Sequence, residues 1–260
     1  MPTARLHGIE LHYEERGSGP PLLLVPGIPA IASDWAPLAE RLSGSRRAIA
    51  YDNRGSGAST VTPPPYTTAG LAADALGLLD ALEIERADVF GMSLGGMIAQ
   101  ELALGWPERV GRLVLGCTHC GLAHAAPPER EAGLAFAMET DDWAERMRAL
   151  APFAFAPGVD GELLRPFIEK KSADVQDPDG YRGQIAAVLA HDTYERLPEI
   201  RRPTLVLTGE SDRVVPAASS NVLHERIPDS RLEVVGGAGH LFFLERPEES
   251  LRLLEEFLGR

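Results

Sequence analysis

One serine in this sequence stands in a setting suited to covalent chemistry. Ser93 lies at the centre of a G-x-S-x-G pattern, residues 91–95. An apolar run typical of a strand, 87–90, precedes the pattern, and a helical pattern, 94–105, follows it. A strand-to-helix turn this sharp strains the serine backbone and leaves room only for glycine on either side. The turn predicts a Ser93 nucleophile beside the Leu94 amide, a candidate oxyanion donor at the start of the helix.

A serine hydroxyl is a weak nucleophile and needs a neighbouring base. Of the seven histidines, His240 is the best candidate, because it ends a glycine-rich loop that follows the last apolar run, 232–235. Chemistry in parallel α/β sheets collects on the loops at the carboxyl ends of strands. His119 and His124 also follow a strand-like run and are the alternatives.

The acid that would orient the imidazole is predicted to be Asp212. It lies in the loop after the apolar run 204–207, so the chain order is serine, acid, histidine. Glu210, slightly upstream in the same loop, is the rival acid.

The elements that must position these residues alternate between strand and helix patterns. Residues 5–15 predict two short strands with a bend near Gly8. Short apolar runs predict buried strands at 22–25, 48–51, 87–90, 113–115, 204–207 and 232–235. Helical patterns lie at 35–42, 68–82, 94–105, 217–226 and 247–258, the first with Asp34 as its expected N-cap. The alternation predicts a mostly parallel sheet with helices on both faces.

One long segment, 119–200, interrupts this alternation. It contains no good strand and carries three helical patterns, at 128–150, 160–173 and 179–191. We therefore expect a core domain built from 1–118 and 201–260, with 119–200 inserted as a helical cap over the sheet.

Length and composition are those of an ordinary globular chain. The 260 residues are 44% hydrophobic and 24% charged, which is enough to bury a sizeable core. The net charge of −13 argues against nucleic-acid binding, which usually needs a basic face. No apolar stretch suits a transmembrane helix, and the first residues do not resemble a signal peptide. We expect a cytoplasmic protein, monomeric or homodimeric, that binds neither nucleic acid nor membranes.

Four motifs together resemble the α/β-hydrolase superfamily over nearly the whole chain, at 51–59, 91–96, 209–216 and 237–240. The resemblance implies an α/β-hydrolase fold with an eight-stranded, mostly parallel sheet flanked by helices. It also implies a helical cap between the sixth and seventh strands. The most similar branch is that of small esterases, enol-lactonases and cofactor-free perhydrolases. Asp52 and Arg54, in a segment similar to the family's D-x-R-G-x-G-x-S loop, are expected to build that loop and not to react.

The same resemblance identifies a second oxyanion donor. Relatives usually carry His-Gly after the third strand, whereas this chain has Pro26 and Gly27. In the family the residue after that glycine donates its amide, which here implies Ile28. Unlike a proline, Ile28 has the N–H that this role needs.

The substrate pocket is expected between the cap and the sheet edge. Bulky side chains are the candidate lining residues: Trp35, Met92, Cys120, Phe136, Met138, Trp143, Phe153 and Phe155. Their alternative role is to form the core of the cap. Arg146, Arg148 and Arg165 could pair with a substrate carboxylate, although solvated helix faces are the simpler interpretation.

Neither a cofactor nor a metal is expected. Cys117, His119, Cys120 and His124 cluster closely in the sequence, whereas four-ligand zinc sites usually draw on two separated ligand pairs. Two neighbouring thiols at the end of a strand are the simpler interpretation.

The sequence thus predicts a serine hydrolase that cleaves carboxylic esters of small, largely apolar substrates through an acyl-enzyme. Lactonase, perhydrolase or carbon–carbon bond hydrolase activity with the same triad is an alternative. A small-molecule receptor that retains the triad is another. Ser93 argues against the dehalogenase and epoxide hydrolase chemistry of relatives that use aspartate at this position.

Overall fold

A computed structural model describes residues 2–140, 142–174 and 176–259. Its strands form one sheet in the order β1-β2-β4-β3-β5-β6-β7-β8. Their bounds are β1 (Thr3–Leu6), β2 (Ile9–Arg16), β3 (Pro21–Val25), β4 (Arg47–Tyr51), β5 (Ala87–Met92), β6 (Val110–Gly116), β7 (Thr204–Gly209) and β8 (Ser230–Val235). β2 pairs antiparallel with β1 and β4, and all other pairs are parallel. The predicted eight-stranded, mostly parallel sheet is confirmed.

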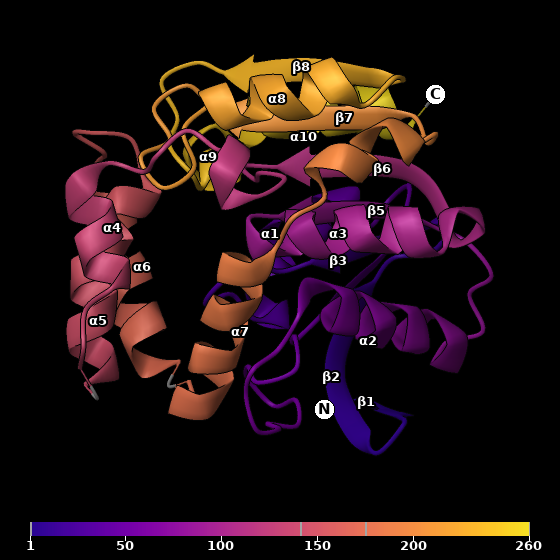
Figure 1. The fold of residues 1–260 in the computed structure, drawn as a ribbon, viewed down its shortest axis with the longest axis horizontal. Coiled ribbons are helices and arrows are strands. Elements are labelled where there is room, and N and C mark those ends of the chain that lie inside the picture. The colour runs from indigo at the N-terminus through magenta and orange to yellow at the C-terminus, as the bar shows by residue number, and fades with distance from the viewer. Residues whose placement is uncertain (1, 141, 175, 260) are drawn as a thin grey trace.

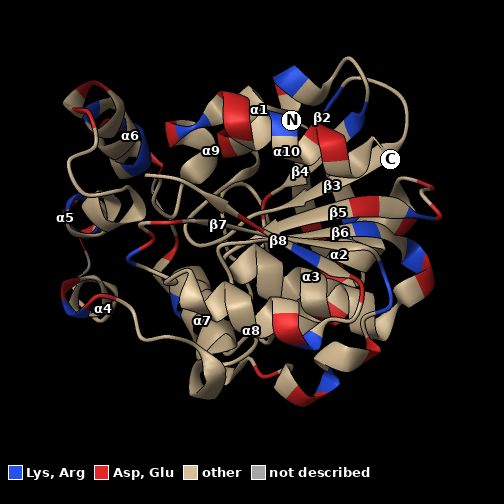
Figure 2. Ribbon diagram, turned by 90° about the horizontal axis from the view of Figure 1, so that it is seen from above, with Lys and Arg blue, Asp and Glu red and all other residues tan. Residues whose placement is uncertain are grey.

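Helices cover both faces of this sheet. Their bounds are α1 (Ala36–Leu42), α2 (Thr68–Ala81), α3 (Leu94–Gly105), α4 (Arg130–Phe136), α5 (Trp143–Leu150), α6 (Gly161–Ala173), α7 (Pro178–Ala190), α8 (Ala218–Arg226), α9 (Phe242–Glu245) and α10 (Pro247–Leu258). α2, α3 and α8 lie on one face, and α1 and α10 lie on the other (Figures 1 and 2). Among the helices of the described residues, none has the length and apolarity that a membrane crossing needs.

The strand runs are continuously apolar because both sheet faces are buried. Along β3, Leu22 and Leu24 belong to the core beneath α1 and α10, whereas Leu23 and Val25 belong to the core beneath α2, α3 and α8. Successive side chains of a strand point to opposite faces, so one apolar run serves both cores.

The segment between β6 and β7 carries α4, α5, α6 and α7. α4, α5 and α6 stand beyond the carboxyl ends of the strands, while α7 lies nearer the sheet (Figure 1). The single helix expected at 128–150 is wrong, because α4 ends at Phe136 and Asp142 starts α5 by accepting a hydrogen bond from the Glu145 amide at 3.0 Å. The division into a core domain and a cap at 119–200 stays a prediction.

The expected N-cap of α1 is also wrong. Asp34 lies inside a 3₁₀ turn, Ala32–Trp35, that precedes α1, and its carboxylate accepts a hydrogen bond from the Ile31 amide at 2.9 Å. Asp34 therefore shapes the loop after β3 and leaves the first turn of α1 without a side-chain cap.

Candidate active site

Ser93 occupies the turn between β5 and α3 in a strained backbone conformation. Its φ of 56° and ψ of −120° lie in a region that residues with a side chain rarely adopt. The Ser93 amide donates to the Gly116 carbonyl at 2.8 Å, and the Thr118 hydroxyl donates to the Ser93 carbonyl at 2.8 Å. These bonds to the end of β6 hold the strained turn in place.

The glycines around Ser93 are required by close backbone approach. A Cβ on Gly91 would lie 2.1 Å from the Gly95 carbonyl oxygen, and one on Gly95 would lie 2.0 Å from the Val25 carbonyl oxygen. A Cβ on Gly96 would lie 2.5 Å from a Thr118 side-chain carbon. The turn therefore excludes any larger residue at these three positions.

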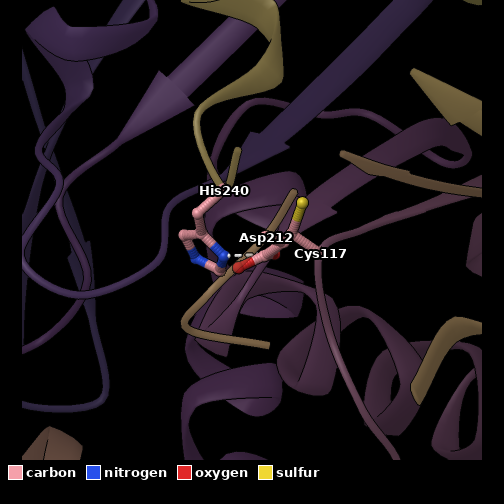
Figure 3. Close-up of side chains that lie close together, drawn as sticks. All are labelled: Cys117, Asp212 and His240. Atoms are coloured by element: carbon pink, nitrogen blue, oxygen red, sulfur yellow. Dashed lines mark hydrogen bonds and ion pairs between the residues drawn. The ribbon is translucent and has the colours of Figure 1, made fainter. Parts of the chain in front are cut away.

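Asp212 and His240 form a buried pair at the ends of β7 and β8. The His240 Nδ1 lies 2.7 Å from the Asp212 Oδ2 (Figure 3). The other carboxylate oxygen, Oδ1, accepts hydrogen bonds from the Val214 and Val215 amides at 2.8 and 2.9 Å. An ionised carboxylate can only accept, so Nδ1 carries the proton and Nε2 is left with a free lone pair.

Cys117, at the end of β6, lies beside the Asp212–His240 pair (Figure 3). Ligand atoms of Cys117, Asp212 and His240 all lie within 4.8 Å of one another. Burial, together with the nearby charge of Asp212, raises the pKa of the Cys117 thiol well above its ordinary value. The thiol thus stays protonated and is no competing nucleophile.

The amides expected to stabilise an oxyanion are both free. Within the described part of the chain, neither the Ile28 N–H nor the Leu94 N–H donates a hydrogen bond. The loop that carries Ile28, residues 26–31, touches the serine, since a Cβ on Gly27 would lie 3.5 Å from the Ser93 Oγ. The Pro26 carbonyl accepts a hydrogen bond from the Asn53 side chain at 2.9 Å, which ties this loop to the end of β4.

The rival acid and bases are engaged elsewhere. The Glu210 carboxylate accepts a hydrogen bond from the Gly237 amide at 2.8 Å. The His119 Nδ1 accepts one from the Gly121 amide, and the His124 ring stacks on Tyr194. Of the four residues considered for a metal, Cys117 is the one that joins a cluster of potential ligands among the described residues.

Several of the candidate site residues line one cavity of about 210 Å³. Ser93, His240, Gly27 and Ile28 line it, although no hydrogen bond joins the Ser93 Oγ to His240 in the described chain. Of the predicted lining residues, Trp35, Met92 and Phe136 lie on its wall.

Five predicted lining residues lie outside this cavity, because packing turns them elsewhere. Phe155 packs edge-on against Phe167, and Phe153 lies beneath the Arg213 guanidinium. The Trp143 indole donates to the Lys171 carbonyl at 2.8 Å, Cys120 is buried in the main core, and Met138 lines an outer hollow beside α4.

Sequence reasoning missed the helical wall of the cavity. Met147, Leu150, Ala151 and Ala154 line it from α5 and the turn that follows. Their spacing is that of one face of a helix, so this periodicity could have identified them. The predicted lining residues were bulky side chains, whereas this wall contains two alanines.

Charged residues on the cavity wall were also missed. Asp34, Lys170 and Lys171 line the cavity and pair with one another. The arginines considered instead do not line this cavity. Arg148 pairs with Asp142, the N-cap of its helix, and Arg165 pairs with Glu162, and both pairs are exposed. The half-buried Arg146 guanidinium lies 4.7 Å from the centre of the Tyr181 ring.

The sheet order and the strained serine turn define the class of protein as an α/β hydrolase. Residues 22–253 match the alpha/beta hydrolase family, so the chain belongs to this family and to the hydrolase class of enzymes.

Similar proteins include hydrolases with different activities. The chain is 34% identical to a 2-hydroxymuconate semialdehyde hydrolase from Pseudomonas, over 97% of this chain and 91% of the relative. The crystal structure of an enol-lactonase from Burkholderia xenovorans covers all of both chains, with 29% identity and a TM-score of 0.90. A thermophilic esterase from Thermogutta terrifontis shows 27% identity and a TM-score of 0.84, over 99% of this chain and 97% of its own.

Proposed function

We propose that this protein is a serine hydrolase that cleaves carboxylic esters of small, uncharged, largely apolar substrates. The observation that carries the proposal is one cavity lined by Ser93, by Ile28 with its free amide, and by His240, whose Nδ1 is paired with Asp212. In this proposal the segment 119–200 acts as a cap that supplies one side of the apolar wall, including Phe136, Met147 and Leu150.

The proposed reaction proceeds through an acyl-enzyme. The His240 Nε2 takes the Ser93 hydroxyl proton as Oγ attacks the ester carbonyl, and the Leu94 and Ile28 amides stabilise the resulting oxyanion. The carbon–oxygen bond to the alcohol breaks, and His240 returns its proton to the departing alkoxide. A water molecule then gives a proton to His240 and attacks the acyl-enzyme. The bond between Oγ and the acyl carbon breaks as His240 passes this proton to Oγ, which releases the acid and restores the Ser93 hydroxyl. Asp212 stabilises the imidazolium in both halves of the reaction.

The charge of the cavity supports a preference for neutral substrates. Its cations, Lys170 and Lys171, are already paired with Asp34 and Asp174. A substrate carboxylate would have to displace one of these partners and bury an additional negative charge, which is costly.

Lactone hydrolysis is the second candidate. The close structural match to an enol-lactonase favours it, and a lactone is a cyclic ester that the same residues can open. The reaction differs only in that the alcohol stays attached to the acyl group. The paired cavity lysines support neutral lactones over those that carry a carboxylate.

A substrate panel tests the proposal. It contains p-nitrophenyl acetate, butyrate and octanoate, a neutral γ-lactone, and the monoethyl ester of a dicarboxylic acid beside its diethyl ester. We expect turnover of the neutral esters within the usual enzyme range of about 1–10³ s⁻¹ and a preference of at least about tenfold for the diethyl ester. Ser93→Ala should abolish turnover and leave the circular dichroism spectrum unchanged.

Two results would contradict the proposal. Turnover below about one per hour with tight ligand binding would instead support a receptor. Retention of most activity in Ser93→Ala would exclude Ser93 as the nucleophile.

A further inference from the structure

A cluster of four charged residues joins the loop beside Ser93 to helix α6. We call it the Asp34 cluster, and it consists of Asp34, Lys170, Lys171 and Asp174. The Lys170 and Lys171 ammonium groups each lie 2.6 Å from one Asp34 carboxylate oxygen. Asp174 contacts the same two ammonium groups at 2.8 and 3.2 Å. Two carboxylates thus balance two ammonium groups, so the cluster carries no net charge.

The cluster is buried enough for its pairing to matter. The Lys171 side chain is 3% exposed, and that of Asp34 is 17% exposed. Burial alone would raise the pKa of Asp34, but the Lys171 charge and the hydrogen bonds from both lysines and the Ile31 amide outweigh it and lower the pKa. An ammonium group as buried as that of Lys171 is tolerated only with charged partners, so removing one should move the helix that carries it.

Asp34 also fixes the backbone of the loop that carries Ile28. The oxygen that pairs with Lys171, Oδ2, accepts the Ile31 amide at 2.9 Å. Two other hydrogen bonds hold the ends of this loop to the segment after β4 and not to α6. The Asn53 side chain donates to the Pro26 carbonyl, and the Ala32 amide donates to the Asp52 carboxylate. Asp34 is therefore the anchor that connects the loop to α6.

The position of α6 bears directly on the site. Phe167, Lys170 and Lys171 of this helix line the same cavity as Ser93 and His240. A shift of α6 would open this wall, and the Asp34 carboxylate would transmit the shift to Ile31 and the loop 26–31. Small displacements of a catalytic amide are expensive, since about 1 Å can cost about 10²-fold in rate.

We propose that Asp34 is a positioning residue that couples the seating of α6 over the cavity to the placement of the Ile28 amide at Ser93. This inference rests on the proposed serine hydrolase function. Lys171 is the partner through which α6 holds Asp34, and Lys170 supports the contact from the cluster's exposed side.

Two variants weaken the connection between Asp34 and α6 in different ways. Asp34→Asn removes the charge that holds both lysines. Lys171→Met removes the buried part of the link to α6 but leaves the Lys170 pair and the contact between Asp34 and the Ile31 amide intact. Arg165→Met is the matched control, because Arg165 lies on the same helix in an exposed pair with Glu162. Circular dichroism at the assay temperature establishes that each variant is folded.

The measurements are the phosphonylation rate of Ser93 by a small fluorophosphonate, kcat and KM for p-nitrophenyl butyrate, and hydrogen exchange of the amides of 161–173. In both variants we expect faster exchange in α6 and slower phosphonylation, by about tenfold, because the displaced loop stabilises the oxyanion less well. kcat should fall with the phosphonylation rate, while KM changes less. The double variant should be no slower than Asp34→Asn alone, since both changes break one link.

The outcomes distinguish this inference from the function on which it rests. Faster exchange in α6 with phosphonylation rates within about twofold of wild type would make the cluster merely structural and overturn the coupling. An equal effect of Arg165→Met would also overturn it. Absence of phosphonylation in the wild-type protein would overturn the proposed function, and the coupling with it.

Discussion

Asp212 divides its two carboxylate oxygens between different tasks. Oδ1 accepts the Val214 and Val215 amides, which fix the orientation of the carboxylate, and Oδ2 faces the His240 Nδ1 at 2.7 Å. This division predicts how an amide would behave at position 212. In Asp212→Asn the oxygen would stay on the two backbone amides, so the NH₂ group would face Nδ1.

The expected result of Asp212→Asn is a loss of turnover of about 10³–10⁴-fold with little change in fold. An NH₂ group facing Nδ1 forces the imidazole proton onto Nε2, where it can no longer accept the Ser93 proton. Single-turnover kinetics with p-nitrophenyl acetate measures the effect. Glu210→Gln is the control, because a glutamine oxygen can still accept the Gly237 amide, and its activity should match the wild type. An equal loss in both variants would contradict the assignment of Asp212.

Helix α7 shows how an element of the segment between β6 and β7 is fitted against the loop after β4. Its first turn meets the loop after β4 through two glycines, since a Cβ on Gly180 would lie 2.0 Å from the Gly55 carbonyl oxygen. One turn further on, the Gln184 side chain donates to the Arg54 carbonyl and to the Ser56 hydroxyl at 3.0 and 2.6 Å. The motif around Asp52 and Arg54 therefore builds a docking surface for α7.

Gly180→Ala tests this contact because two effects oppose each other there. Alanine favours a helix over glycine by about 1 kcal/mol. Overpacking against rigid backbone costs about 1–3 kcal/mol, and the contact at position 180 is severe. We expect a net destabilisation of about 1–2 kcal/mol in urea unfolding. Gly161→Ala in α6 is the control, because its Cβ would meet nothing within 4 Å and should not destabilise the protein. Equal stability of the two variants would argue against tight docking of α7.

At the scale of the whole molecule, two buried histidines lie near the two ends of the segment between β6 and β7. His119 follows β6, and His191 ends α7 between the Thr68 and Thr193 hydroxyls at 3.0 and 3.4 Å. Burial lowers the pKa of His119 to about 4. Burial and the nearby His119 lower the pKa of His191 to about 3, and Asp192 and Arg196 also face it with opposing effects.

These lowered values predict that the protein loses stability in mild acid. Both histidines stay neutral in the folded state but take up a proton in the unfolded state below their ordinary pKa of about 6.5. Their contribution to the free energy of unfolding is therefore complete above pH ~6.5. As the pH falls from ~6.5 to ~4, this contribution decreases by about 1.4 kcal/mol per pH unit for each histidine. Urea unfolding across this range measures how the free energy of unfolding changes with pH, which gives the number of protons taken up on unfolding. His191→Gln should reduce that number by about one. An unchanged slope in this variant would contradict a neutral, buried His191.

Local sterics and periodicity made much of this protein predictable from its sequence. The glycines around Ser93 could be foreseen because a sharp strand-to-helix turn has no space for a Cβ, and the contacts of Gly91 and Gly95 bear this out. Buried parallel strands are continuously apolar, so runs such as 22–25 identified them directly. The positions of Ser93, Asp212 and His240 at carboxyl strand ends followed from the same pattern.

Only the tertiary structure decided which side chains reach the cavity. Trp143 and Phe155 looked like lining residues, but the packing of α5 and α6 turns them away, while Met147 and Leu150 face inward. Lys171, near the end of α6, is buried because Asp34, 137 residues earlier, pairs with it. The sequence by itself determines the local conformation that exposes Ser93. The wall of the cavity beside Ser93 depends on contacts between distant segments, which no local pattern encodes.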